Sequence, residues 1–316
     1  MLYFFRKKRY NKHMEQTLQK IKAARRIVVK VGTSTLTHEN GGANLHSLSR
    51  LVRVLSAIHN SQLTINNAEG NNPLQSLQLP SGGVAAPPEL SGHCPRREVI
   101  LVTSGAMGVG VSKLGMSERP KDTPGRQAAA AVGQCILMTM YDRMFGERDQ
   151  LVAQLLLTRR NTETPESRRN LQNTFERLLE LGVLPIVNEN DSVAVEELED
   201  VFGDNDNLSA KVAQLIGADL LLLLTDTDGL FDSNPRENPN AAVISFVPKV
   251  TDEVLALADG KGSARGTGGM MTKLLAAQSA TQAGIPTVIL NGNAPEQLYD
   301  LLDAAAAGTI FGVMDN

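Results

Sequence analysis

The chain has 316 residues, 42% of them hydrophobic, and a formal net charge of −3 at pH 7, which excludes a disordered chain and suits one large α/β domain or two small ones. No apolar run reaches the roughly 20 residues of a membrane-spanning helix, and the body of the chain lacks the basic patch of a nucleic-acid-binding protein. The two cysteines, Cys94 and Cys135, have neither metal-binding spacing nor a disulfide framework, so we predict a cytoplasmic protein with no membrane or nucleic-acid partner.

The N-terminal end is strongly basic. Residues 1–26 hold nine Lys and Arg against one acid, Glu15, a contribution of +8, so residues 27–316 carry −11 of the total of −3. Residues 1–9 have two interpretations: a weak targeting or membrane-surface signal, or a frayed basic tail upstream of a start at Met14. The second is favoured because no long apolar core follows. We therefore predict a disordered basic extension over residues 1–25.

Short apolar stretches alternate with longer amphipathic ones along the rest of the chain. The apolar stretches are nearly continuous in hydrophobicity, as strands of a parallel sheet are. We predict strands at residues 27–31, 99–102, 152–157, 184–187, 220–224 and 287–290. We predict helices at residues 45–58, 123–145, 168–181, 208–216, 269–283 and 295–304. This alternation predicts an α/β fold with a mostly parallel sheet covered on both faces, whose ligands bind beyond the carboxyl ends of the strands.

One segment breaks the alternation. Residues 61–97 are rich in Ser, Pro, Gly and Asn and lie between a predicted helix and a predicted strand, where a short connection is usual. We predict a flexible surface insertion without a role in chemistry.

The segment 203–210, Gly-Asp-Asn-Asp-Asn-Leu-Ser-Ala, places two acids and two amides at the start of a predicted helix. Buried polar groups need partners, and a helix N-terminus favours negative charge. One interpretation is a site for a phosphorylated or carboxylate substrate. The other is a surface turn in which Asp and Asn cap the helix. The segment alone does not decide between them.

Five further segments at predicted strand ends or helix starts carry polar or glycine-rich residues. Lysine with glycine occurs at residues 30–34 and in Gly-Thr-Gly-Gly-Met-Met-Thr-Lys at 266–273, a combination typical of phosphate cradles. Thr-Ser-Gly-Ala follows at 103–106, Asn-Glu-Asn-Asp at 188–191 and Thr-Asp-Thr-Asp-Gly at 225–229. Each motif is weak alone, and neither a Walker A motif nor a dinucleotide fingerprint is present. Together they indicate a phosphate-handling site at one edge of the sheet.

These motifs resemble those of the glutamate 5-kinases, within the amino acid kinase family, over roughly residues 26–311. The lysine and glycine loops occur across the wider family, whereas the pair at 188–191 and 203–207 is specific to the glutamate enzymes. The resemblance implies a three-layer α/β/α sandwich around a mostly parallel sheet. It also implies one amino acid kinase domain over residues 26–316, without the C-terminal PUA domain of many bacterial relatives.

The resemblance also implies which residues form the site. Three would act on the transferring phosphoryl group: Lys30, Asp206 and Lys273. Three would bind L-glutamate: Ser104, Asp191 and Asn205. A larger set would bind ATP: Lys30, Thr225, Asp226, Thr267, Gly268, Gly269, Met270, Met271, Thr272 and Lys273.

ATP and Mg²⁺ are the implied cofactors, with no protein metal site because the nucleotide phosphates hold the ion. The implied reaction is phosphorylation of the γ-carboxylate of glutamate, the first step of proline biosynthesis. That carboxylate has a pKa of about 4.3 and needs no general base, and no histidine occurs in any motif. Relatives are dimers or tetramers and are often inhibited by proline, so we expect a homo-oligomer and feedback by L-proline.

Three alternatives remain open on the sequence. Another member of the family could use acetylglutamate, aspartate, carbamate or a nucleotide monophosphate, although the motifs at 188–191 and 203–207 argue against this. A catalytically inactive amino-acid sensor would not need both Lys30 and Lys273. A scaffold protein would act through the basic extension and the insertion.

Overall fold

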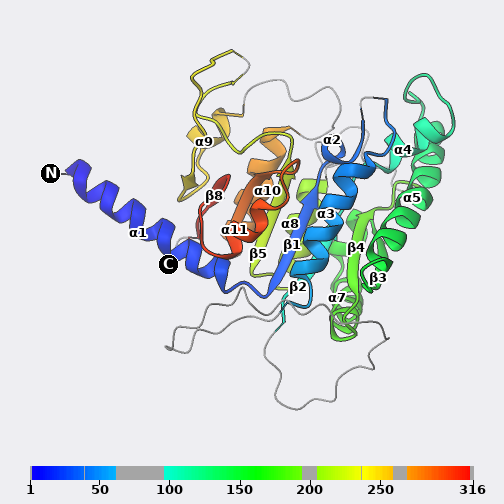
Figure 1. The fold of residues 1–316 in the computed structure, drawn as a ribbon, viewed down its shortest axis with the longest axis horizontal. Helices are drawn as coiled ribbons and strands as arrows, with labels where there is room; N and C mark the ends of the chain where they lie inside the picture. Colours follow the sequence, from blue (N-terminus) through cyan, green and yellow to red (C-terminus); the bar gives the residue numbers. More distant parts are fainter. Residues whose placement is uncertain are drawn as a thin grey trace.

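The computed structural model is an eight-stranded sheet with helices on both of its faces (Figure 1). It describes residues 2–38, 40–61, 96–193, 205–235, 237–258 and 269–313, with the side chains of residues 2–10, 159 and 160 excepted. The strands are β1 (Arg26–Val31), β2 (Glu98–Val102), β3 (Val152–Leu157), β4 (Leu184–Glu189), β5 (Leu220–Thr225), β6 (Phe246–Val247), β7 (Thr287–Asn291) and β8 (Thr309–Phe311). The longer helices are α1 (Leu2–Lys22), α3 (Leu45–Ile58), α4 (Ala106–Lys113), α5 (Thr123–Gly146), α7 (Pro165–Glu180), α8 (Asn205–Leu215) and α10 (Met270–Gln282). The shorter ones are α2 (Thr33–Leu36), α6 (Arg159–Glu163), α9 (Asp252–Ala256) and α11 (Gln297–Leu302).

The strands lie in the order β3-β4-β2-β1-β5-β7-β8-β6. All neighbours from β3 to β7 pair in parallel, and β7 pairs with β8 in the antiparallel sense. In the centre of the sheet, Lys30 lies level with Val102 of β2 and Leu223 of β5. The carboxyl ends of β4, β2, β1 and β5 are therefore neighbours at one edge of the sheet. The predicted mostly parallel α/β sheet is confirmed.

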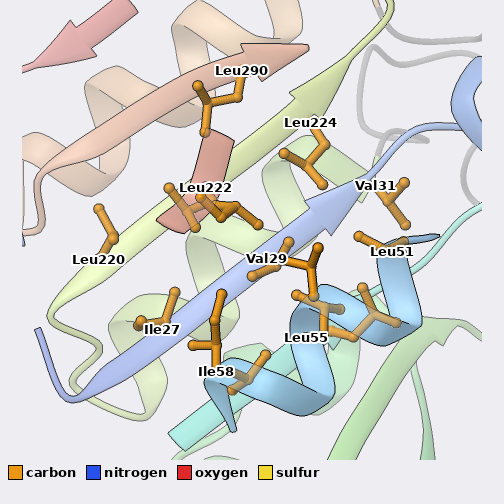
Figure 2. Close-up of a cluster of buried hydrophobic side chains, with 14 of the residues drawn as sticks. Ile27, Val29, Val31, Leu51, Leu55, Ile58, Leu220, Leu222, Leu224 and Leu290 are labelled. Carbon is orange, nitrogen blue, oxygen red and sulfur yellow. The ribbon is translucent and has the colours of Figure 1, made fainter. Parts of the chain in front are cut away.

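The two faces of the sheet bury two separate hydrophobic cores. In β1, Ile27, Val29 and Val31 belong to the core shared with α3, α5 and α11, whereas Val28 belongs to the core shared with α7, α8 and α10. Figure 2 shows the first core, where side chains of α3 lie beside β1 and alternate leucines of β5 continue the same cluster. Successive side chains of a strand point to opposite faces of the sheet, and here both faces are covered by helices. Most residues of such a strand are therefore apolar, which explains the nearly continuous apolar runs.

The predicted helices are present, with shifts at their starts. α7 begins at Pro165, three residues before the predicted start at Arg168, because Thr164 caps it by accepting a bond from the Ser167 N–H at 3.3 Å. α8 begins at Asn205 rather than at residue 208, so the polar motif is part of the helix itself. α11 is shorter than predicted, and the sequence did not predict β6 and β8, which are two and three residues long.

The N-terminal extension was predicted to be disordered, and the structure describes residues 2–22 as helix α1, which extends away from the sheet in Figure 1. Its last turns pack on the body of the protein through Leu18 and Ile21, which are 9% and 0% exposed. The His13 ring contacts Phe246 edge-on, with 5.5 Å between centroids. Apolar residues three apart lie on one face of a helix, and this face of α1 packs on the core.

Residues 62–95, nearly all of the predicted insertion, lie outside the described residues. Within the part of the chain that the structure describes, no helix is long and apolar enough to cross a bilayer.

Candidate active site

Lys30 comes from the central strand β1, and strand alternation decides which way it points. It lies two residues after Val28, whose side chain belongs to the core on the side of α8 and α10. Residues two apart in a strand share a face, so Lys30 points toward α8. Its side chain is 4% exposed, and a buried ammonium group needs a counter-charge.

Asp206 supplies that counter-charge from the first turn of α8, and a second lysine shares it. Lys30 Nζ lies 2.7 Å from Asp206 Oδ1, and Lys273 Nζ lies 3.1 Å from Asp206 Oδ2. The Asp206 and Lys273 side chains are 0% and 7% exposed. Two ammonium groups share one carboxylate, so this trio has a positive surplus at the carboxyl edge of the sheet. Such a surplus suits a polyanionic ligand.

The start of α10 extends this positive region. Thr272 Oγ1 lies 2.9 Å from both Asp206 Oδ2 and the Gly269 carbonyl, and its single hydrogen bonds one of them at a time. Gly269 caps α10 without a side-chain hydrogen bond, so the first N–H groups of this 13-residue helix have no side-chain acceptor at the cap. Unpaired N–H groups at a helix start attract anions. Met270 and Met271 are half-buried at the same turn.

A second polar group adjoins the trio through Asn205. Its Nδ2 lies 2.6 Å from the Thr103 carbonyl, 2.9 Å from Ser104 Oγ and 3.0 Å from Asn188 Oδ1. Its Oδ1 is buried and has no hydrogen-bond partner among the described residues. A buried acceptor without a partner costs about 1–3 kcal/mol, and a ligand with an N–H or ammonium donor would remove that cost.

Ser104 and Asp191 lie where the sequence places them, after β2 and β4. Gly105 follows Ser104 with φ of 94°, a left-handed conformation that turns the chain directly into α4 and that glycine adopts without strain. Asp191 lies in the turn after β4 and is half-buried. The Val193 N–H donates to the carbonyl of the neighbouring Asn190 at 3.1 Å and closes the turn, and Ser192 Oγ donates to Asn190 Oδ1 at 2.7 Å. Ser104, Asp191 and Asn205 therefore come from adjacent strand and helix ends.

Thr225 and Asp226 end β5 on the other side of Lys30. Thr225 is buried and donates to Asp226 Oδ1 at 3.1 Å, while Asp226 is exposed. The Gly292 N–H donates to the Thr225 carbonyl at 2.7 Å and fixes this strand end against β7. Thr267 and Gly268, also predicted for the nucleotide, lie outside the described residues.

Comparison with known proteins shows the family of this chain. The model of the amino acid kinase family matches residues 88–291. A protein of Clostridium perfringens named glutamate 5-kinase is 45% identical over 293 residues, which are 92% of this chain and 96% of that relative. A glutamate 5-kinase of Clostridium acetobutylicum is 46% identical over 286 residues, 90% of this chain and 94% of that relative. The chain belongs to the glutamate 5-kinase family.

A solved structure shows the same fold at lower identity. The isopentenyl phosphate kinase of T. acidophilum, in a product complex, superposes with a TM-score of 0.54 at 15% identity, over 90% of this chain and 99% of that one. This likeness concerns the fold alone, and it confirms the three-layer α/β/α sandwich expected for the glutamate 5-kinase family.

Metal-binding donors are scarce in this member of the family. Among the described residues, no group of three or more His, Cys, Asp and Glu side chains is placed to hold an ion. Both oxygens of Asp206 face lysine ammonium groups, which compete with a cation for them. This donor set suits a magnesium ion that the nucleotide phosphates coordinate.

Some polar residues of this region were not predicted as site residues. Asn188 lies inside a quoted motif, whereas Gln134 and Tyr141 lie on α5, outside every motif. Tyr141 OH lies 2.8 Å from Thr103 Oγ1, and burial raises the pKa of the phenol, which therefore keeps its proton. Only the helical spacing of the two α5 residues, seven apart, could have suggested that they share a face.

Proposed function

We propose that this chain catalyses the ATP-dependent phosphorylation of the γ-carboxylate of L-glutamate, giving γ-glutamyl phosphate and ADP, the first step of proline biosynthesis. The observation that carries the proposal is the carboxylate of Asp206, which lies 2.7 Å from Lys30 Nζ and 3.1 Å from Lys273 Nζ, next in sequence to Asn205. Relatives named glutamate 5-kinase, 45% and 46% identical to this chain, support glutamate as the acceptor.

In the proposed reaction, Lys30 and Lys273 stabilise the charge on the γ-phosphoryl group, and Asp206 holds both ammonium groups in place. A γ-carboxylate oxygen of glutamate attacks the γ-phosphorus. The bond from that phosphorus to the β,γ-bridging oxygen breaks, and its electron pair leaves with ADP. A carboxylate with a pKa of about 4.3 is already ionised at neutral pH, so no proton moves and no general base is needed.

Glutamate would be held by Ser104, Asp191 and Asn205. The α-ammonium group is a donor that matches Asn205 Oδ1, the buried acceptor without a partner among the described residues. Holding the acceptor in line with the phosphorus supplies much of the rate enhancement when the nucleophile needs no activation.

ATP would be bound by Lys30, Thr225, Asp226 and the loop of residues 267–273. The N–H groups at the start of α10 and Lys273 approach the phosphates there. A magnesium ion held by the phosphates would draw charge away from the γ-phosphorus. The protein's part is to orient the triphosphate against the acceptor.

Further properties belong to the same proposal. The enzyme is a cytoplasmic homo-oligomer, a dimer or tetramer, and L-proline inhibits it. Its kinase domain spans residues 26–316, with residues 61–97 as a peripheral insertion. The family resemblance supports the oligomer, the inhibition by L-proline and the domain. The cysteine content supports the cytoplasmic location, and the composition of residues 61–97 supports the insertion.

The test is ADP release from Mg-ATP with L-glutamate, with hydroxylamine present to convert the acyl phosphate to a hydroxamate. Glutamate-dependent hydroxamate is the expected result. The control set replaces glutamate with N-acetylglutamate, aspartate or a nucleotide monophosphate. Release of ADP with one of these and not with glutamate would overturn the proposed acceptor.

A further inference from the structure

Helix α5 places two buried polar side chains under the proposed acceptor side of the site. Gln134 and Tyr141 are 8% and 0% exposed, and residues seven apart lie on one face of a helix. Tyr141 reaches Thr103 after β2, and Gln134 reaches Asn188 near the carboxyl end of β4. Both strand ends adjoin Asn205, so α5 supports this part of the site from the face opposite α8.

The contacts of Gln134 form a chain of amides that ends at Asn205. Gln134 Oε1 accepts a hydrogen bond from Asn188 Nδ2 at 2.7 Å. Asn188 Oδ1 accepts in turn from Asn205 Nδ2 at 3.0 Å. Asn188 and Asn205 lie at the carboxyl end of β4 and the start of α8, whereas Gln134 lies in the middle of α5. Asn188 is 3% exposed.

A backbone carbonyl fixes the direction of this chain. The Thr103 carbonyl, 2.6 Å from Asn205, can only accept, so Asn205 must present Nδ2 to it. Asn188 must then present Oδ1 to Asn205, and Gln134 must present Oε1 to Asn188. With Gln134 in place, a flip of Asn188 would set Nδ2 against Nδ2 at Asn205 and oxygen against oxygen at Gln134. Asn205 therefore keeps Oδ1 directed away from this chain of amides, toward the proposed position of the ammonium group of glutamate.

We propose that Gln134 is a positioning residue for the phosphate acceptor: it holds Asn188 with Oδ1 toward Asn205 and so reinforces the orientation that the Thr103 carbonyl gives the Asn205 amide. The inference rests on the proposed function, because it assumes that Asn205 binds glutamate. Its role requires the acceptor Oε1 and not the donor Nε2. Gln134 Nε2 has no hydrogen-bond partner among the described residues, as expected if Oε1 is the atom that matters.

The first experiment compares two substitutions at this position in the full chain. Gln134→Met keeps the volume and removes the acceptor, leaving Asn188 Nδ2 without a partner. We expect the KM for glutamate to rise about tenfold, with the KM for ATP unchanged. Gln134→Glu keeps an acceptor oxygen for Asn188 in either protonation state, so the KM for glutamate should stay near that of the wild type.

Gln150→Met is the matched control for general damage. Gln150 is also a buried glutamine, at 7% exposure, and it donates to the carbonyls of Leu151 and Gly182 at the opposite edge of the sheet. The Gln150→Met variant should have a lower thermal midpoint and an unchanged KM for glutamate. An equal rise of the glutamate KM in both methionine variants would overturn the positioning role.

A double substitution separates action through Asn188 from direct contact with the substrate. If Gln134 acts through Asn188, Gln134→Met should add nothing to the glutamate KM in an Asn188→Ala background. If the two effects multiply, Gln134 touches the substrate itself and the inference is wrong. Failure of the proposed function looks different, because the wild type would then form no hydroxamate from glutamate; that result would overturn both.

Discussion

Replacing Asp206 with asparagine removes the charge that two buried lysines share and leaves the shape of the side chain almost unchanged. Lys30 Nζ and Lys273 Nζ lie 2.7 Å and 3.1 Å from its two oxygens, and all three side chains are 7% exposed or less. An asparagine keeps one acceptor and turns an N–H₂ group toward the other ammonium group.

The expected cost follows from that geometry. Removing one partner of a buried ion pair typically destabilises a protein by about 3–5 kcal/mol. At about 2 °C per kcal/mol for a chain of this size, the thermal midpoint should fall by about 6–10 °C. Turnover should fall by at least about 100-fold, because both proposed phosphate-binding groups lose their positions.

The assay is thermal unfolding and initial rates of hydroxamate formation at saturating substrates. Asp142→Asn, which neutralises an exposed carboxylate on α5, is the control and should change the free energy of unfolding by less than about 0.5 kcal/mol. If Asp206→Asn has the midpoint and turnover of the wild type, the lysines hold their positions without the shared carboxylate.

Three further predictions concern other parts of the molecule. His59 is 3% exposed, and burial lowers its pKa to about 4. Between pH 6.5 and 4 the unfolded chain therefore binds a proton at His59 that the folded protein does not bind, so stability falls as the pH drops through this range. From pH 7.5 to 5 the wild type should lose about 2 kcal/mol more unfolding free energy than His59→Gln, and equal losses in urea titrations would contradict this. At Gly133, a Cβ would lie 1.7 Å from the Ala106 carbonyl oxygen, so Gly133→Ala must push α5 from α4 and should cost about 3 kcal/mol or more. Gly146→Ala, on the same helix with nothing within 4 Å of the added Cβ, should be neutral, and similar unfolding midpoints for the two would disprove the contact. Asp191→Ala should raise the KM for glutamate about tenfold or more with little change in the KM for ATP, and equal changes in the two constants would remove Asp191 from the acceptor side.

Much of the fold follows from the sequence because β1 and β5 are buried on both faces. In β5, which is buried along its whole length, Leu220 to Leu224 are all apolar, and that run can be recognised in the sequence alone. Strands β6 and β8 are two and three residues long, too short for any periodicity to reveal. Their pairing depends on contacts with β7 and with each other.

The start of α8 shows where local sequence misleads. Asp and Asn disfavour helix interiors, so the helix was predicted to begin at residue 208 rather than at Asn205. Tertiary contacts favour the earlier start at Asn205. Asp206 pairs with lysines from β1 and α10, and Asn205 donates a hydrogen bond to the Thr103 carbonyl after β2. The motifs predict candidate site residues, but the distances between their side chains could not be predicted from the sequence.

No sequence motif predicts a role for Gln134. It lies 54 positions before Asn188 in the sequence, on a long helix without a polar motif, and its contact exists only because α5 packs over the ends of β2 and β4. A glutamine on a helix is usually a solvated residue, so its type carries no signal. The burial of Gln134 and the direction of its hydrogen bond support the proposed role.

The central claim is that a carboxylate oxygen of glutamate attacks the γ-phosphorus beside Lys30 and Lys273. The most direct measurement uses L-glutamate labelled with ¹⁸O in both γ-carboxylate oxygens, with Mg-ATP and hydroxylamine. Hydroxylamine attacks the acyl carbon and expels phosphate together with the bridging oxygen. If glutamate is the nucleophile, mass spectrometry should find one ¹⁸O atom in each phosphate released. Phosphate without the label, formed at the rate of ADP, would show that water rather than glutamate is the nucleophile and would contradict the account.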